Sequence, residues 1–102
     1  MVKVIFNPNK DLIYFEVLNH AEKSEACVAV SSICNVLVSY MDLIGIDPNC
    51  YDSGHVLYNI EFEQNESVQN AARRLMVKEI FRAVYNTLLA AADEFKGQIK
   101  FY

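Results

Sequence analysis

Basic residues, glycines, cysteines and long apolar runs are all scarce in this sequence. Nine Lys and Arg stand against thirteen Asp and Glu, which gives a net charge of -4. A protein that binds duplex nucleic acid normally carries a basic stripe, so nucleic acid is not an expected partner. No uninterrupted apolar stretch approaches the ~18 residues that a membrane span requires, and the first residues lack the regions of a signal peptide. We therefore expect a cytoplasmic protein without a membrane partner.

The few glycines and cysteines exclude further classes of protein. Three glycines cannot build a phosphate-binding loop, and the sequence has no Gly-x-Gly-x-x-Gly or Walker-type motif. The cysteines Cys27, Cys34 and Cys50 form an odd set without a Cys-x-x-Cys pair, so a disulfide scaffold is not expected. A metal site could be built only from His20 and these cysteines, and their spacing follows no known ligand pattern. We expect neither a metal nor a cofactor.

Apolar residues are abundant by contrast. They make up 53% of the 102 residues, and a small domain has much surface for its volume, so the excess suggests a self-association surface. Two segments carry this excess: in 26–46 the only charged residue is Asp42, and 83–92 has none. A helix with so few charges is buried on more than one side. We expect one domain, residues 1–102, that forms a homodimer through these segments.

Hydrophobic periodicity predicts the order ββαββαβ. In the second strand, for example, Ile13, Phe15 and Val17 share one face. The pattern predicts two helices. The second is opened by 64–67 and runs to about Phe95, with Gly97 beyond its end. The order predicts an α+β fold, in which a mainly antiparallel sheet carries both helices on one face. The predicted elements are strands over 2–6, 12–18, 50–52, 55–62 and 98–102, and helices over about 24–45 and 64–95.

The residues that could carry chemistry lie around His20 and Cys27. His20 follows the second strand, and Cys27 falls in the first turn of the first helix if Ser24 is its N-cap. The exposed N–H groups and the dipole of a helix start stabilise a thiolate and can hold an oxyanion. The connection over 21–26 is long enough to return the histidine to the helix start. A nucleophile and a general base are the minimal needs of a cysteine hydrolase.

Structural interpretations stand beside these chemical ones. A cysteine is most often a small buried hydrophobe, which is the interpretation we adopt for Cys34 and Cys50. His55 is expected at the surface or at a sheet edge. Ser31 lies one turn after the candidate nucleophile on the same helix face. It either touches the site or allows the helix to pack closely on the sheet, and both interpretations stay open.

The residues around the candidate pair resemble the Prp family of ribosomal-processing cysteine proteases. The resemblance rests on Asn19-His20-Ala21, where the family has Gly-His-Ala, and on Cys-Val-Ala-Val-Ser-Ser over 27–32. The family has Asp-Ile-Val-Cys-Ala-Ala-Val-Ser at the corresponding start of its first helix. The likeness extends over the whole chain, to the closing strand at 99–102.

The resemblance implies a cysteine endopeptidase with Cys27 as nucleophile and His20 as general base. It also implies substrate contacts from Ser31 and from Ser24, which stands where the family has an aspartate. Prp enzymes are homodimers that remove the N-terminal extension of a large-subunit ribosomal protein (protein twenty-seven), cutting after an aromatic pair. A basic ribosomal substrate suits an acidic enzyme.

This sequence also departs from the family pattern. Asn19 replaces a family glycine, a mild change because Asn tolerates a left-handed backbone best after Gly. The connection from histidine to cysteine is shorter and has lost a glycine-rich stretch, and Glu22 or Glu25 stands in for the missing aspartate if the dyad needs one. Two alternatives remain: a non-catalytic dimeric peptide-binding module on the same fold, and a redox-sensing thiol protein. The latter lacks a resolving cysteine at close spacing.

Overall fold

The computed structural model describes residues 1–9, 11–19, 25–52, 54–62 and 67–102. Its element order is ββαββαβ, which confirms the prediction. The elements are β1 (Val2–Pro8), β2 (Leu12–Asn19), α1 (Glu25–Leu43), β3 (Cys50–Asp52), β4 (His55–Glu61), α2 (Val68–Glu94) and β5 (Ile99–Phe101). Three residues singled out from the sequence, His20, Glu22 and Ser24, lie outside the described residues.

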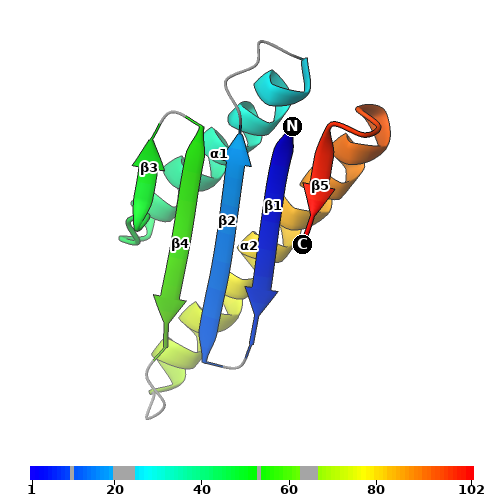
Figure 1. Ribbon diagram of the computed structural model, residues 1–102. Coiled ribbons are helices and arrows are strands. Elements are labelled where there is room, and N and C mark those ends of the chain that lie inside the picture. The colour runs from blue at the N-terminus through cyan, green and yellow to red at the C-terminus, as the bar shows by residue number, and fades with distance from the viewer. Residues whose placement is uncertain (10, 20–24, 53, 63–66) are drawn as a thin grey trace.

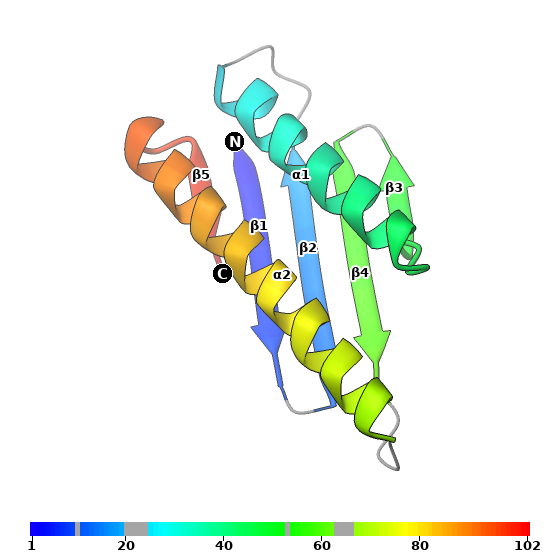
Figure 2. The ribbon, with the colours of Figure 1, turned by 180° about the vertical axis from the view of Figure 1, so that it is seen from behind.

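The five strands form one sheet in the order β3-β4-β2-β1-β5. All neighbouring strands are antiparallel except β1 and β5, which pair in parallel with Val2 opposite Ile99. Both helices cover the same face of this sheet and leave the other face open (Figures 1 and 2). The expected mainly antiparallel sheet with two helices on one face is therefore confirmed.

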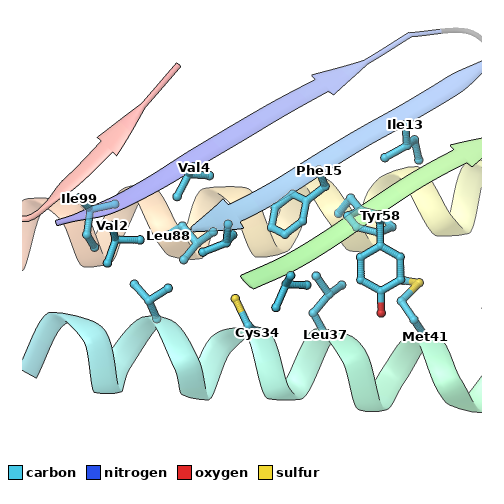
Figure 3. Packing of buried hydrophobic residues seen from close by; sticks show 14 of the residues in the cluster. Val2, Val4, Ile13, Phe15, Cys34, Leu37, Met41, Tyr58, Leu88 and Ile99 are labelled. Carbon is cyan, nitrogen blue, oxygen red and sulfur yellow. The ribbon is translucent and has the colours of Figure 1, made fainter. Parts of the chain in front are cut away.

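The core fills the space between this sheet and its two helices. Ile13, Phe15 and Val17 of β2 point together into it and are at most 2% exposed, as the alternating pattern predicts. Phe81 of α2 packs against Phe15 and Tyr58, with ring centroids 5.4 and 5.2 Å apart. Figure 3 shows that buried side chains on the inner side of α1 face those of the sheet. That inner side consists of Val30, Cys34, Leu37 and Met41, at successive helical turns.

Helix α1 is long and apolar enough to cross a membrane by length and composition alone. In the fold, its inner residues are buried against the sheet, as expected of a core helix. Its outer side carries a second apolar stripe that is exposed. This outer α1 stripe consists of Val28, Val36, Tyr40 and Leu43, which are 65, 68, 48 and 82% exposed.

Helix α2 begins and ends close to where the sequence predicts. Ser67 is its N-cap, because the Ser67 side chain accepts a hydrogen bond from the backbone N–H of Asn70 at 3.2 Å. The helix ends at Glu94, and Gly97, with φ of 81°, turns the chain into β5. Strand β5 then pairs with β1 and brings the C-terminal segment into the sheet.

Candidate functional site

Asn19, the last residue of β2, joins three elements at one end of the molecule. Its side-chain Nδ2 donates to the Oγ of Ser31 at 2.9 Å and to the carbonyl oxygen of Cys27 at 3.2 Å. Its backbone N–H donates to the carbonyl oxygen of Gly54 at 2.7 Å. The end of β2 is therefore fixed both to the first two turns of α1 and to the turn between β3 and β4.

Cys27 is the third residue of α1, in the first turn where the sequence places it. Its side chain is buried, with only 8% of the residue exposed. The start of a helix concentrates backbone N–H groups and the positive end of the helix dipole. Both favour an anion, either a thiolate or the oxyanion of a tetrahedral intermediate.

A cleft of about 450 Å³ opens between α1 and the β3–β4 hairpin. Such a volume is within the range of small ligand pockets. Its lining on α1 begins at Val30, one turn after Cys27, which is not part of the lining. Ser31 lies in its wall, next to the bond from Asn19. Across the cleft, the hydroxyl of Tyr51 donates to Oδ1 of Asn35 and joins the hairpin to α1. The full lining is Val17, Asn19, Val30, Ser31, Cys34, Asn35, Tyr51, Asp52, Gly54, His55 and Val56.

Gly54 allows the hairpin to approach β2 closely enough to form this cleft. Its φ is 84°, a left-handed conformation that residues with a Cβ rarely adopt. A Cβ at this position would lie 2.3 Å from the carbonyl oxygen of Asn19. Any larger residue would therefore push the hairpin away from the end of β2.

Cys34 also lines the cleft, but its chemistry differs from that expected of a nucleophile. Burial raises the pKa of the Cys34 thiol to about 12. A thiol that stays protonated is a poor nucleophile. Cys34 is 4% exposed and packs in the core, which confirms the structural interpretation made from the sequence.

The structure thus brings together Asn19, the backbone of Cys27, and Ser31, whereas the predicted His20 and Ser24 lie outside the described residues. Asn19 does not use the left-handed backbone that its residue type tolerates, because among the described residues only glycines have positive φ. Its contribution is the pair of side-chain hydrogen bonds, which no local sequence signal reveals because Ser31 is 12 positions away.

One other structural interpretation is corrected: Cys50 is half-buried on β3 rather than part of the core. Of the two positions expected for His55, the sheet edge is excluded, because β4 pairs with a neighbour on each side. Its side chain is 32% exposed, and its ring contacts both Cys50 and Glu16. Among the described residues, no group of three His, Cys, Asp or Glu side chains is placed to hold a metal ion.

Comparison with known proteins gives the same fold and little sequence similarity. No protein-family model matches the chain, and no curated protein matches its sequence. The chain is similar to a crystal structure of the essential ribosomal processing protease Prp from S. aureus in complex with a substrate peptide. The TM-score is 0.69 at 18% identity, and the match covers 100% of this chain and 98% of that one.

A second structure of the same S. aureus protease, with a covalently linked product peptide, gives a TM-score of 0.67 at 18% identity. That match covers 99% of this chain and 97% of the other. The chain therefore has the fold of Prp over its full length, as the sequence resemblance implies.

Proposed function

We propose that this protein is a cytoplasmic cysteine endopeptidase of the Prp type, with Cys27 as nucleophile and His20 as general base. Its substrate would be the N-terminal extension of a large-subunit ribosomal protein, protein twenty-seven. The observation that carries this proposal is the pair of bonds from Asn19 to Ser31 and to the turn of Cys27. They occur in a fold shared with a protease seen in complex with a substrate peptide.

The residue that precedes the proposed base in the sequence is held at the first turn of α1. Nδ2 of Asn19 is 3.2 Å from the carbonyl oxygen of Cys27, and the next residue in the sequence is His20. A general base must come within hydrogen-bond reach of the group it deprotonates.

The reaction would proceed by covalent catalysis. The thiol proton of Cys27 passes to His20 as the sulfur attacks the scissile carbonyl carbon, and N–H groups at the helix start hold the oxyanion. Collapse of the tetrahedral intermediate breaks the C–N bond, and the leaving amine takes the proton from His20. Water, deprotonated by the same histidine, then hydrolyses the thioester and regenerates the thiol.

The cleft supplies a place for the peptide substrate. Ser31 and Asn35 from α1 and Tyr51 from the hairpin give its walls polar groups that can bond a peptide backbone. We propose that Ser31 and Ser24 contact the substrate. The net charge of -4 favours a basic ribosomal peptide through electrostatic complementarity.

Cleavage of a synthetic peptide tests this function. The peptide copies the ribosomal extension with its aromatic pair, and mass spectrometry identifies the products. Wild type is expected to cut after the aromatic pair, and Cys27→Ala is expected to be inactive. Cys50→Ser, which removes a thiol on β3 instead of in the first turn of α1, is the matched control and is expected to cleave normally. Absence of cleavage by wild type, or equal cleavage by Cys27→Ala, would overturn the proposal.

The burial of Cys27 favours a second candidate function. A residue only 8% exposed offers little thiol surface to a substrate, and the shortened connection removes part of the family pattern. A non-catalytic peptide-binding module would keep the cleft and bind the same peptide without turnover. Binding and cleavage measured on one peptide separate the two functions.

We also propose that the protein acts as a homodimer with the outer α1 stripe (Val28, Val36, Tyr40 and Leu43) in the interface. Each of these side chains is at least 48% exposed. Asp42 is the one charged residue from Ala26 to the end of the helix, so a second copy would bury this surface at little electrostatic cost. The charge-free segment 83–92 of α2 lies in the same helix layer.

A further inference from the structure

A second cysteine–histidine pair lies on the open face of the sheet, opposite the helices. In the register of the three strands, Leu57 of β4 is opposite Cys50 of β3 and also opposite Glu16 of β2. These residues therefore form one row across three adjacent strands. Val56 and Tyr58 are buried toward the helices, so the alternate residues His55 and Leu57 face the other way.

His55, two residues before Leu57 on the same strand, links the two outer members of this row by side-chain contacts. Nδ1 of His55 lies 3.3 Å from Sγ of Cys50, and Nε2 lies 2.7 Å from Oε2 of Glu16. The hydroxyl of Tyr14 donates to the other carboxylate oxygen, Oε1 of Glu16, at 3.2 Å. Partial burial, together with its bond to Glu16, raises the pKa of Tyr14, so the phenol keeps its proton and remains a donor.

These contacts select one tautomer of the neutral imidazole. A carboxylate only accepts hydrogen bonds, so Nε2 of His55 carries the hydrogen that it donates to Glu16. In the neutral ring this leaves Nδ1 with a lone pair, which accepts from the thiol of Cys50. A nucleophile, a base in contact with it, and a third group that orients the base form the usual arrangement of an activated nucleophile.

Two other chemical roles fit this cluster less well. Cys50 and Glu16 contact opposite nitrogens of the His55 ring, so the three groups do not converge on one point where a metal ion could bind. Acyl transfer needs donors for an oxyanion. The backbone N–H groups of β4, which carries His55, are engaged in pairing with β2 and β3. Attack on a disulfide needs neither a metal nor an oxyanion hole.

We propose that Cys50 is a reactive thiol that exchanges with low-molecular-weight disulfides, with His55 as its base and Glu16 as a positioning residue. The thiol proton passes to Nδ1 of His55, and the Cys50 sulfur attacks one sulfur of the disulfide R–S–S–R. The Cys50–S–S–R bond forms as the S–S bond of the reagent breaks, and the leaving thiolate takes the proton from His55. Cys50 is oxidised, and half of the reagent is reduced to the thiol R–SH.

Accessibility supports this chemistry at Cys50 rather than at the other two cysteines. Cys50 is half-buried on the open face, beside a His55 side chain that is 32% exposed. Cys27 and Cys34 are buried on the helix side of the sheet. Neither is placed to resolve a mixed disulfide on the opposite face. The mixed disulfide therefore persists until an external thiol removes it.

The test is incubation of the whole protein with oxidised glutathione, followed by peptide mapping that quantifies the mixed disulfide at each cysteine separately. Cys50 is expected to react first. His55→Asn is expected to slow its reaction by ~10-fold or more, and Glu16→Gln by a smaller factor. Glu61→Gln changes the same charge on an exposed residue of β4, and is the matched control, with no change in rate.

Equal rates at Cys50 in wild type and His55→Asn would overturn the proposal, as would reaction at Cys27 alone. If circular dichroism shows that His55→Asn does not fold, Glu16→Gln is compared with Glu61→Gln instead. Equal Cys50 rates in these two variants would also overturn the proposal. Alkylation of Cys50 by iodoacetamide is a second readout of the same activation. Cys27→Ala is expected to leave the Cys50 rate unchanged, so the result is independent of peptide cleavage.

Discussion

The side-chain Nδ2 of Asn19 lies 3.2 Å from the carbonyl oxygen of Cys27. This bond fixes the end of β2 against the first turn of α1. A second bond from the same amide reaches Ser31 at 2.9 Å. One short polar side chain therefore holds the parts of the proposed active site in place.

Asn19→Ala removes both bonds while leaving the backbone intact. We expect kcat/KM for the ribosomal peptide to fall by roughly 10- to 100-fold, because small displacements of a catalytic pair are costly. The free energy of unfolding should fall by about 1–3 kcal/mol. Asn86→Ala, on an exposed position of α2, is the control: kcat/KM should not change, and the free energy of unfolding should not fall, because Ala is the better helix former. An unchanged kcat/KM in Asn19→Ala would show that the bonds do not position the site.

The glycine at the hairpin turn gives a second prediction. Gly54→Ala introduces a Cβ both at positive φ and 2.3 Å from a backbone oxygen, so urea unfolding should show a loss of roughly 2 kcal/mol or more. Gly97→Ala is the matched control, because φ is 81° but no atom lies within 4 Å of the added Cβ. Its loss should be about 1 kcal/mol. Equal losses would mean that the contact with Asn19 is unimportant.

Stability should fall in alkaline solution because two buried groups resist ionisation. Burial raises the pKa of Cys34 and of Tyr58 to about 12 in the folded state. Both groups lose their protons more readily when unfolded. The stability that these two protonated groups contribute to the folded state is therefore fully present below the ordinary pKa values of a thiol and a phenol. It is lost as the pH rises toward about 12.

Tyr58→Phe tests the tyrosine's share of this effect. The variant keeps the ring that packs on Phe81 but cannot ionise, so its stability should decline less steeply between neutral pH and about pH 11. At neutral pH it should be at least as stable as wild type, because within the described residues the Tyr58 hydroxyl is buried without a hydrogen-bond partner. Parallel urea titrations of the two proteins give both comparisons. A variant that follows the wild-type pH curve would contradict the assignment.

The proposed dimer is tested by placing a charge in the outer α1 stripe. Val36, 68% exposed, would be desolvated in the interface, so Val36→Glu should raise the dissociation constant of the dimer by ~10-fold or more. Val68→Glu, at an 87% exposed position at the start of α2, is the matched control. Sedimentation velocity over a range of concentrations measures both. A monomeric wild type, or equal effects of the two variants, would place the interface elsewhere or exclude it.

Local periodicity was enough to predict the elements and the core face of the sheet. Ile13, Phe15 and Val17 alternate with Tyr14 and Glu16, and Cys27 falls in the first turn of an apolar helix. The contacts that build the sites are not local. Glu16 and His55 are 39 positions apart and meet only because β2 pairs with β4 in one particular register.

The role of Asn19 was missed for the same reason. Its residue type suggested a backbone conformation, whereas its side chain bonds a helix that follows later in the chain. The cleft has the same origin, because the β3–β4 hairpin and α1 become neighbours only when the sheet is assembled. Strand order and register, which periodicity does not determine, decide these contacts.

The most direct test of the proposed protease is to measure binding and cleavage of one labelled ribosomal peptide side by side, for wild type and Cys27→Ala. Catalysis by Cys27 predicts that the two proteins bind the peptide with similar Kd. Wild type then cleaves it after the aromatic pair, and the variant is roughly 1000-fold slower or slower still. Binding by both proteins with cleavage by neither would contradict catalysis and identify a binding module.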